Sequence, residues 1–122
     1  MALGVDTWAA QLCVELGIPF DAYVPFVGQE SKWPNASRDA YVALLHKARH
    51  VRMITTGGYS NAAFQRRNKA MVDDCDTLIA VWDGSPGGTA NCVRYAEGAA
   101  QRRKSGPKPL TIERIDPRML AA

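Results

Sequence analysis

The sequence predicts an α/β protein in which parallel strands alternate with helices. Short runs rich in β-branched and aromatic residues alternate with segments of helical periodicity, and glycine or proline separates many of them. The 122 residues are 47% hydrophobic and 22% charged, a composition typical of globular proteins. Because domains commonly contain roughly 100–150 residues, we expect a single domain over residues 1–122.

Four apolar runs are expected to form the strands. They are residues 19–26, 50–56, 77–83 and 109–115. The third run contains LIAVW, an almost continuously apolar segment that is typical of a strand covered by helices on both faces. Alternation of these strands with helices implies parallel pairing through right-handed crossovers.

The segments between these runs carry apolar residues at three- and four-residue intervals, which places one apolar stripe on each expected helix. The stripes are Trp8, Leu12, Cys13 and Leu16; Tyr41, Leu44, Leu45 and Ala48; Phe64, Met71, Val72 and Cys75; and Cys92, Val93, Ala96 and Ala100. Gly17 is expected to end the first helix, and Asp6 to cap its start. Ser60 or Asn61 is expected to cap the third helix.

The charge balance favours a small anionic ligand over a long nucleic acid. Fifteen Lys and Arg residues against twelve Asp and Glu give a net charge of +3, and the basic residues are interspersed with carboxylates. Nucleic-acid binders usually concentrate positive charge on one face. Two or three arginines from the basic groups at residues 66–69 and 102–104 would serve a ligand of nucleotide size.

Cysteine spacing and hydropathy exclude several other classes. Cys13, Cys75 and Cys92 form no CxxC pair, so neither a disulfide framework nor a zinc site is indicated, and we expect no resident cofactor. No apolar stretch approaches the ~18 residues of a membrane span. The N-terminal segment lacks the features of a signal peptide, so we expect a cytoplasmic protein that does not associate with membranes.

The turn after the third expected strand is the strongest candidate for ligand binding. It comprises Asp83, Gly84, Ser85, Pro86, Gly87, Gly88 and Thr89. In open parallel sheets, ligands bind beyond the carboxyl ends of the strands. Glycines allow the backbone to approach a phosphate closely, and the following helix start offers unpaired N–H groups. Thr89 would add a hydroxyl, and Asp83 would accept a hydrogen bond from a ribose hydroxyl.

Two further helix starts have similar features. Gly57 and Gly58 follow the second expected strand, and the helix after them carries Arg66 and Arg67, of which only one can face a cleft. At the N-terminal helix, Gly4 would allow close approach of an anion. Each feature also has an alternative without a ligand: Arg66 and Arg67 are solvated, residues 83–89 form an ordinary tight turn, and Asp6 is a purely structural cap.

The common catalytic and dinucleotide motifs are absent. The sequence has no GxGxxG, P-loop or GxSxG pattern. Glu30 and Glu97 are the carboxylates considered for acid–base chemistry. Trp33 and Trp82 are the rings considered for stacking on a base, although packing is the alternative for Trp82.

Four segments, taken in order over roughly residues 1–100, resemble the SLOG superfamily. They read MALGVDTWAA, VPFVGQESKWP, GGYSNAAFQRRNKAMVDDCD and LIAVWDGSPGGTANCVRYAE. This superfamily includes the DNA-processing protein A family, the Lonely Guy phosphoribohydrolases and the YpsA-like bacterial and phage proteins, and the resemblance is closest to the last group. It implies a Rossmann-like three-layer parallel sheet that binds nucleotides or nucleotide-derived ligands.

The resemblance also implies roles for particular residues. Gly87, Gly88 and Thr89 look like the family's phosphate-binding turn. Gly4 and Asp6 look like the end of its N-terminal glycine-rich segment, and the RRN block begins at Arg66.

Two departures from the family pattern affect what the resemblance implies. Members carry a strand–helix–strand segment ahead of the position of Met1, so the fold is expected to be N-terminally shortened. Three explanations are open: the true start of the protein lies upstream, a partner chain supplies the missing strands, or the protein is a trimmed variant with altered strand pairing. If strand edges are exposed, we expect homo-oligomers to cover them. Lonely Guy enzymes share PGGxGTxxE with a catalytic glutamate, whereas Cys92 occupies that position here.

The sequence therefore favours a protein that binds a nucleotide-derived ligand as a sensor or a sequestering protein, rather than an enzyme. The first alternative is a phosphoribohydrolase or N-glycosidase acting on a nucleoside monophosphate. The second alternative is binding of single-stranded DNA, which the DNA-processing relatives imply.

Overall fold

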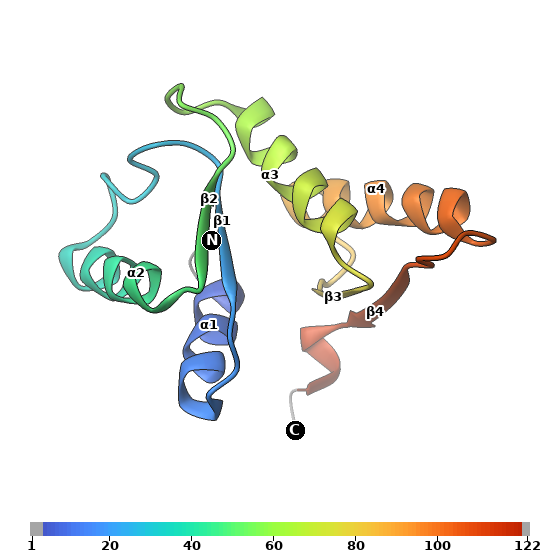
Figure 1. Cartoon of the computed structure of the whole chain (residues 1–122), viewed down its shortest axis with the longest axis horizontal. Helices are drawn as coiled ribbons and strands as arrows, with labels where there is room; N and C mark the ends of the chain where they lie inside the picture. Colours follow the sequence, from blue (N-terminus) through green and yellow to red (C-terminus); the bar gives the residue numbers. More distant parts are fainter. Residues whose placement is uncertain (1–3, 121–122) are drawn as a thin grey trace. The chain divides into compact units, whose positions relative to one another are not determined.

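The computed structural model describes residues 4–120 and confirms a parallel α/β class (Figure 1). The described elements, in chain order, are α1 (Val5–Leu16), β1 (Asp21–Val24), α2 (Asn35–Lys47), β2 (His50–Met53), α3 (Asn61–Asp74), β3 (Thr77–Val81), α4 (Gly88–Arg103), β4 (Thr111–Ile115) and the 3-10 turn η1 (Pro117–Leu120). Each strand lies within the apolar run that predicted it, and each is shorter than that run.

The chain divides into two compact units, residues 1–63 and residues 64–122. The described strands pair two by two, β1 with β2 and β3 with β4, and both pairs are parallel. Each pair joins consecutive strands through one crossover helix, which makes each a βαβ unit. The division into two compact units does not test whether residues 1–122 form a single domain, which stays a prediction.

The first unit packs α1 and α2 on one apolar cluster. Ala10, Tyr41 and Leu44 are buried at its centre. The Trp33 ring meets the Tyr41 ring edge-on, with 5.1 Å between centroids. The β1–β2 register pairs Asp21 with His50 and Val24 with Met53.

The ends of α1 confirm one expectation and correct another. Gly17 ends the helix in the left-handed conformation, with φ of 69°, as its position predicts. The expectation that Asp6 caps the start is wrong, because the helix already begins at Val5 and Gly4 is the N-cap, with φ of 84°. Asp6 instead lies in the first turn, where a carboxylate suits the positive end of the helix dipole.

The second unit packs α3 and α4 against the β3–β4 pair. Its buried cluster contains Val72, Ala96, Ala99 and Leu110, with Leu78 and Ile112 packed against it. Side chains alternate between the two faces of a strand, so Ile79 points away from the Leu78 side and is 61% exposed. Coverage of LIAVW on its second face therefore stays a prediction, because within the second unit α3 and α4 pack on the Leu78 side.

Arg103 secures the C-terminal end of α3. Its guanidinium donates to the backbone oxygens of Val72 (3.4 Å), Cys75 (3.0 Å) and Lys108 (2.7 Å). The bonds to Val72 and Cys75 satisfy carbonyls near the helix end and place a cation at the negative end of its dipole. Arg103, one of the basic residues 102–104 considered for an anionic ligand, thus has a structural role.

Residues 4–120 contain no membrane-spanning helix, no cluster of metal ligands and no disulfide bond. No described helix combines the length and apolar character that crossing a membrane requires. Among the same residues, no three His, Cys, Asp or Glu side chains gather in a way that could hold a metal ion. None of Cys13, Cys75 and Cys92 forms a disulfide.

Candidate functional site

The turn over residues 83–89 begins where β3 leaves its partner strand. The Trp82 backbone N–H donates to the Ile115 oxygen at 2.9 Å, which extends the β3–β4 ladder by one bond. The Trp82 indole Nε1–H then donates to the Ser85 oxygen at 2.8 Å. Trp82 therefore stabilises the turn through its hydrogen bonds, which fits the expectation that it has a packing role rather than one in stacking on a base.

Asp83 organises the first half of this turn. Its Oδ1 accepts the backbone N–H of Ser85 at 2.9 Å. Hydrogen bonds from Ser85 hold the pKa of Asp83 below its ordinary value, and the Arg118 charge lowers it further. The carboxylate is therefore ionised at neutral pH and already serves the turn, while its expected bond to a ribose hydroxyl stays a prediction.

Two glycines of the turn adopt conformations that other residues avoid. Gly84 has φ of 90° and Gly87 has φ of 144°. Gly88 has an ordinary φ, but a Cβ placed on it would meet nothing within 4 Å. The backbone at Gly88 thus borders open space that a ligand atom can occupy.

The N-terminus of α4 follows directly and has no side-chain cap among the described residues. Gly87 is the N-cap residue, and its oxygen accepts the Asn91 N–H at 3.1 Å. The N–H groups of Gly88, Thr89 and Ala90 precede that first helical bond and so lack an acceptor within the helix. With the positive end of the helix dipole, such groups favour an anion.

Arg118 is a cation that the sequence reasoning missed. The register ends with Val81 opposite Ile115, so the residues that follow β4 lie beside the turn after β3. The Arg118 Nη2 lies 2.6 Å from the Asp116 Oδ2, and its Nε donates to Oδ1 at 3.0 Å. The signal in the sequence was an arginine just beyond the last strand, at the same edge as the glycine turn.

The two arginines of α3 have different surroundings. Arg66 is exposed, whereas Arg67 is 6% exposed. The Arg67 Nε donates to the Asn68 Oδ1 at 2.8 Å, and its guanidinium lies 5.9 Å from the centroid of the Phe64 ring. Their contact with a ligand stays a prediction.

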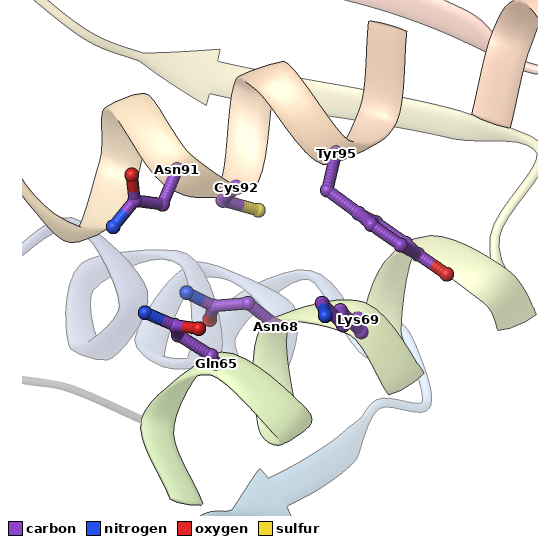
Figure 2. A pocket seen from close by; sticks show the side chains of 6 residues that line it. All are labelled: Gln65, Asn68, Lys69, Asn91, Cys92 and Tyr95. Atoms are coloured by element: carbon purple, nitrogen blue, oxygen red, sulfur yellow. The ribbon is translucent and has the colours of Figure 1, made fainter. Parts of the chain in front are cut away.

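A hollow between α3 and α4 was not identified from the sequence. Its cavity volume is about 50 Å³, and it is open to solvent on one side. Figure 2 shows side chains of the two helices facing each other across it. They are Gln65, Asn68 and Lys69 from α3, and Asn91, Cys92 and Tyr95 from α4. The hollow thus brings the polar segment of α3 beside the first two turns of α4. Both segments belong to the regions that the sequence predicted for ligand binding.

The other expected contacts belong to the first unit. Gly57 and Gly58 have ordinary φ values, and α3 begins only at Asn61. The Ser60 Oγ accepts the Ala63 N–H at 3.0 Å, which confirms the expected cap. Gly4 and Asp6 also lie in this unit, at the start of α1.

The carboxylates and ring considered for catalysis or stacking have other roles or surroundings. Glu97 is exposed on α4, and its Oε1 lies 3.8 Å from the Arg114 Nη2. Glu30 lies in the first unit, as does Trp33, which packs in the cluster around Tyr41. Within the second unit, no described carboxylate lines the hollow.

Comparison with known proteins identifies the family to which the chain is similar. A family model described as the YspA SLOG family (YpsA) matches residues 1–120. A UPF0398 protein of Bacillus cereus strain ATCC 14579 is 34% identical over 94 residues, covering 69% of this chain and 51% of that protein. A UPF0398 protein of Bacillus thuringiensis strain Al Hakam is 31% identical over 107 residues, covering 83% of this chain and 56% of that protein. The chain thus spans about half the length of these bacterial relatives.

Proposed function

The chain belongs to the YpsA SLOG family, and on that premise we propose that it binds a nucleotide or nucleotide-derived ligand. The phosphate lies on the turn over residues 83–89 and on the N–H groups at the start of α4. The protein acts through binding, as a sensor or a sequestering protein.

One observation carries this proposal. The start of α4 has no side-chain cap among the described residues, and open space borders Gly88 beside it. N–H groups of this kind, at the positive end of a helix dipole, are an established setting for phosphate. Arg118 lies at the same edge, but its guanidinium is paired with Asp116 and Asp83 is ionised nearby, so the helix N–H groups and not the local side-chain charge carry the proposal.

The residues around the turn support binding over hydrolysis. An N-glycosidase needs a group that gives or takes a proton near the scissile bond. Cys92 stands where the resemblance places a catalytic glutamate, and Glu97 is paired with Arg114. The family premise and the turn together favour a ligand that stays intact.

A thermal-shift panel first identifies the responding ligand. AMP, ADP-ribose, NAD and a cyclic dinucleotide form the panel, and a short oligonucleotide tests the DNA-binding alternative. A ligand present at about 100 times its Kd adds ~2.7 kcal/mol to the free energy of unfolding, which raises the Tm by several degrees. No shift with any of them would contradict the proposal.

Gly88→Asp then tests the turn itself. The added carboxylate occupies the space for the phosphate and repels it, so we expect AMP affinity to fall at least ~100-fold in calorimetric titration, about 2.7 kcal/mol. Gly58→Asp is the matched control, because Gly58 also has an ordinary φ and open space around it. Circular dichroism melts establish that both variants fold. Unchanged affinity in Gly88→Asp would remove the turn from the site.

A further inference from the structure

We propose that the outer apolar face of α1 is the contact surface for a second copy of this chain, with the two α1 helices packed antiparallel. The inference does not depend on the ligand proposed above, because α1 belongs to the first unit and the glycine turn over residues 83–89 to the second. It names the surface through which the expected homo-oligomers form.

The helix α1 carries apolar residues on two faces. Its inner face contributes Ala10 and Val14 to the cluster around Tyr41 and Leu44. Its outer face carries an apolar stripe at intervals of three and four residues, within an arc of about 80°. The stripe is formed by Val5, Trp8, Leu12 and Leu16, whose exposed fractions range from 42% to 69%. A helix that is apolar on both faces is typical of one that is covered on both.

The area of this stripe suits a contact between two copies. One tryptophan and three aliphatic side chains at these exposed fractions leave on the order of 450 Å² of surface. Monomeric proteins rarely expose a contiguous apolar patch larger than a few hundred Å². With the polar residues that border the stripe, a symmetric pair buries on the order of 1,000 Å² in total, the lower limit for a specific interface. We therefore expect a dimer with a micromolar dissociation constant.

The order of side chains along the stripe is compatible with two-fold symmetry. A symmetric contact requires that residue i of one copy meets residue j of the other, and the reverse. In an antiparallel pair centred near Ala10, Trp8 of each copy lies opposite Leu12 of the other. Val5 lies opposite Leu16 in the same arrangement. Each large side chain thus meets an aliphatic one.

The charges of α1 favour the antiparallel arrangement. Glu15 is exposed, and it follows the N-cap residue Gly4 by eleven residues, which is three turns plus about 20°. The two residues therefore lie along the same edge of the stripe at opposite ends of the helix, whereas Asp6 lies along the other edge. An antiparallel pair brings each Glu15 carboxylate beside the N-terminus of the other α1, which has no side-chain cap hydrogen bond. A carboxylate is stabilised there by the positive end of the helix dipole.

The same charges disfavour a parallel pair and a membrane surface. Parallel helices would place the two Glu15 carboxylates next to each other. Helices that lie on membranes usually carry Lys and Arg on their polar face, and α1 contains neither. A second copy in the antiparallel orientation is therefore the occupant that complements α1.

Sedimentation velocity of the full chain from about 1 to about 300 µM tests the inference. We expect wild type to reach twice the 13.3 kDa of one chain as the concentration rises. Leu12→Lys should raise the dissociation constant at least ~30-fold, because each copy would place a charge in the apolar contact. Lysine is a good helix former and Leu12 is exposed in one copy, so the fold should be retained. Val42→Lys is the matched control, since Val42 is an exposed apolar residue on α2 outside the stripe.

Two further variants test the contact and its orientation. Trp8→Ala should weaken the dimer at least ~10-fold, and it supplies the test if circular dichroism shows that Leu12→Lys does not fold. Glu15→Gln should weaken it roughly threefold to tenfold at low salt, and this difference should vanish at high salt. Asp39→Asn is its control, because Asp39 is an exposed carboxylate on α2.

A wild type that stays monomeric throughout would overturn the inference, and cosedimentation of that monomer with phosphatidylserine vesicles would assign the stripe to a membrane instead. A dimer that persists in Leu12→Lys and Trp8→Ala would also overturn it, because the interface would then lie elsewhere. Equal weakening by Val42→Lys would do the same. A dimer unaffected by Glu15→Gln would overturn the antiparallel arrangement.

Discussion

Two Gly-Gly pairs follow parallel strands in this chain, and the helices after them begin in different ways. After Gly57-Gly58, α3 starts at Asn61, and the Ser60 hydroxyl accepts the Ala63 N–H at 3.0 Å. After Gly87, α4 starts at once with Gly88, and no side chain of the described residues caps it. The same dipeptide thus precedes one helix end capped by its own chain and one helix end without a side-chain cap among the described residues.

The difference separates a structural use of glycine from a binding use. A side-chain cap uses an N–H group that a ligand would otherwise bind. Gly87 also has φ of 144°, which a residue with a Cβ rarely adopts, whereas Gly57 and Gly58 have ordinary values. Glycine content alone therefore does not separate the two turns, whereas the start of the following helix does, and the uncapped start is the one proposed to bind phosphate.

Alanine substitutions at the two turns give the largest expected difference in stability. Gly87→Ala places a Cβ on a backbone of φ 144° and should lower the free energy of unfolding by about 2 kcal/mol. Gly57→Ala should leave it unchanged or raise it by up to ~1 kcal/mol, because the unfolded chain loses freedom. Urea denaturation followed by circular dichroism measures both. Equal losses would show that the two turns carry the same strain.

The pH dependence of AMP binding tests whether the open turn holds a dianionic phosphate. The pKa of Asp83 is lowered, so its stabilising effect is complete above its ordinary value of 3.8 and is lost only as the pH falls through the lower folded value. Asp83 therefore stays ionised between pH 5 and pH 7. Over that interval the ligand phosphate, with a second pKa of about 6, gains a proton, and we expect AMP affinity to fall about tenfold from pH 7 to pH 5.

Asp83→Asn is the control for this titration. It should shift the affinity at every pH by the same factor and leave the slope unchanged. A flat wild-type profile would mean that the turn does not distinguish the dianion from the monoanion.

Hydroxyl deletions give the smallest stability effect and separate the two helix starts most clearly. Ser60→Ala removes the cap of α3 and should lower the free energy of unfolding by about 1 kcal/mol without changing AMP affinity. Thr89→Ala should change stability by less than ~0.5 kcal/mol and weaken AMP binding severalfold. Thermal melts and titration of the same two variants supply both measurements. A stability loss at Thr89 as large as that at Ser60 would indicate that α4 is also capped by its own chain.

Local pattern predicted most of the secondary structure because the deciding interactions are local. Apolar runs located the four described strands, Gly17 located the end of α1, and Ser60 located the start of α3. The start of α1 was misplaced because Gly4 and Asp6 are both plausible caps, and backbone geometry rather than residue type decides between them.

The candidate site was predictable only in part. Residues 83–89 are contiguous, so the sequence alone placed Gly87, Gly88 and Thr89 together at a strand end. Arg118 and the hollow bring together residues distant in sequence, through the β3–β4 register and the packing of α3 beside α4. No local pattern encodes those contacts.

The sequence by itself determined the α/β class, the order of the elements, the absence of a CxxC pair and the family resemblance, because periodicity and short motifs are properties of contiguous residues. Only the tertiary structure decided that the strands pair two by two, that Ile79 is exposed, and that carboxamides of α3 and α4 share one hollow. These features depend on which faces pack together, and packing is set by contacts among residues far apart along the chain.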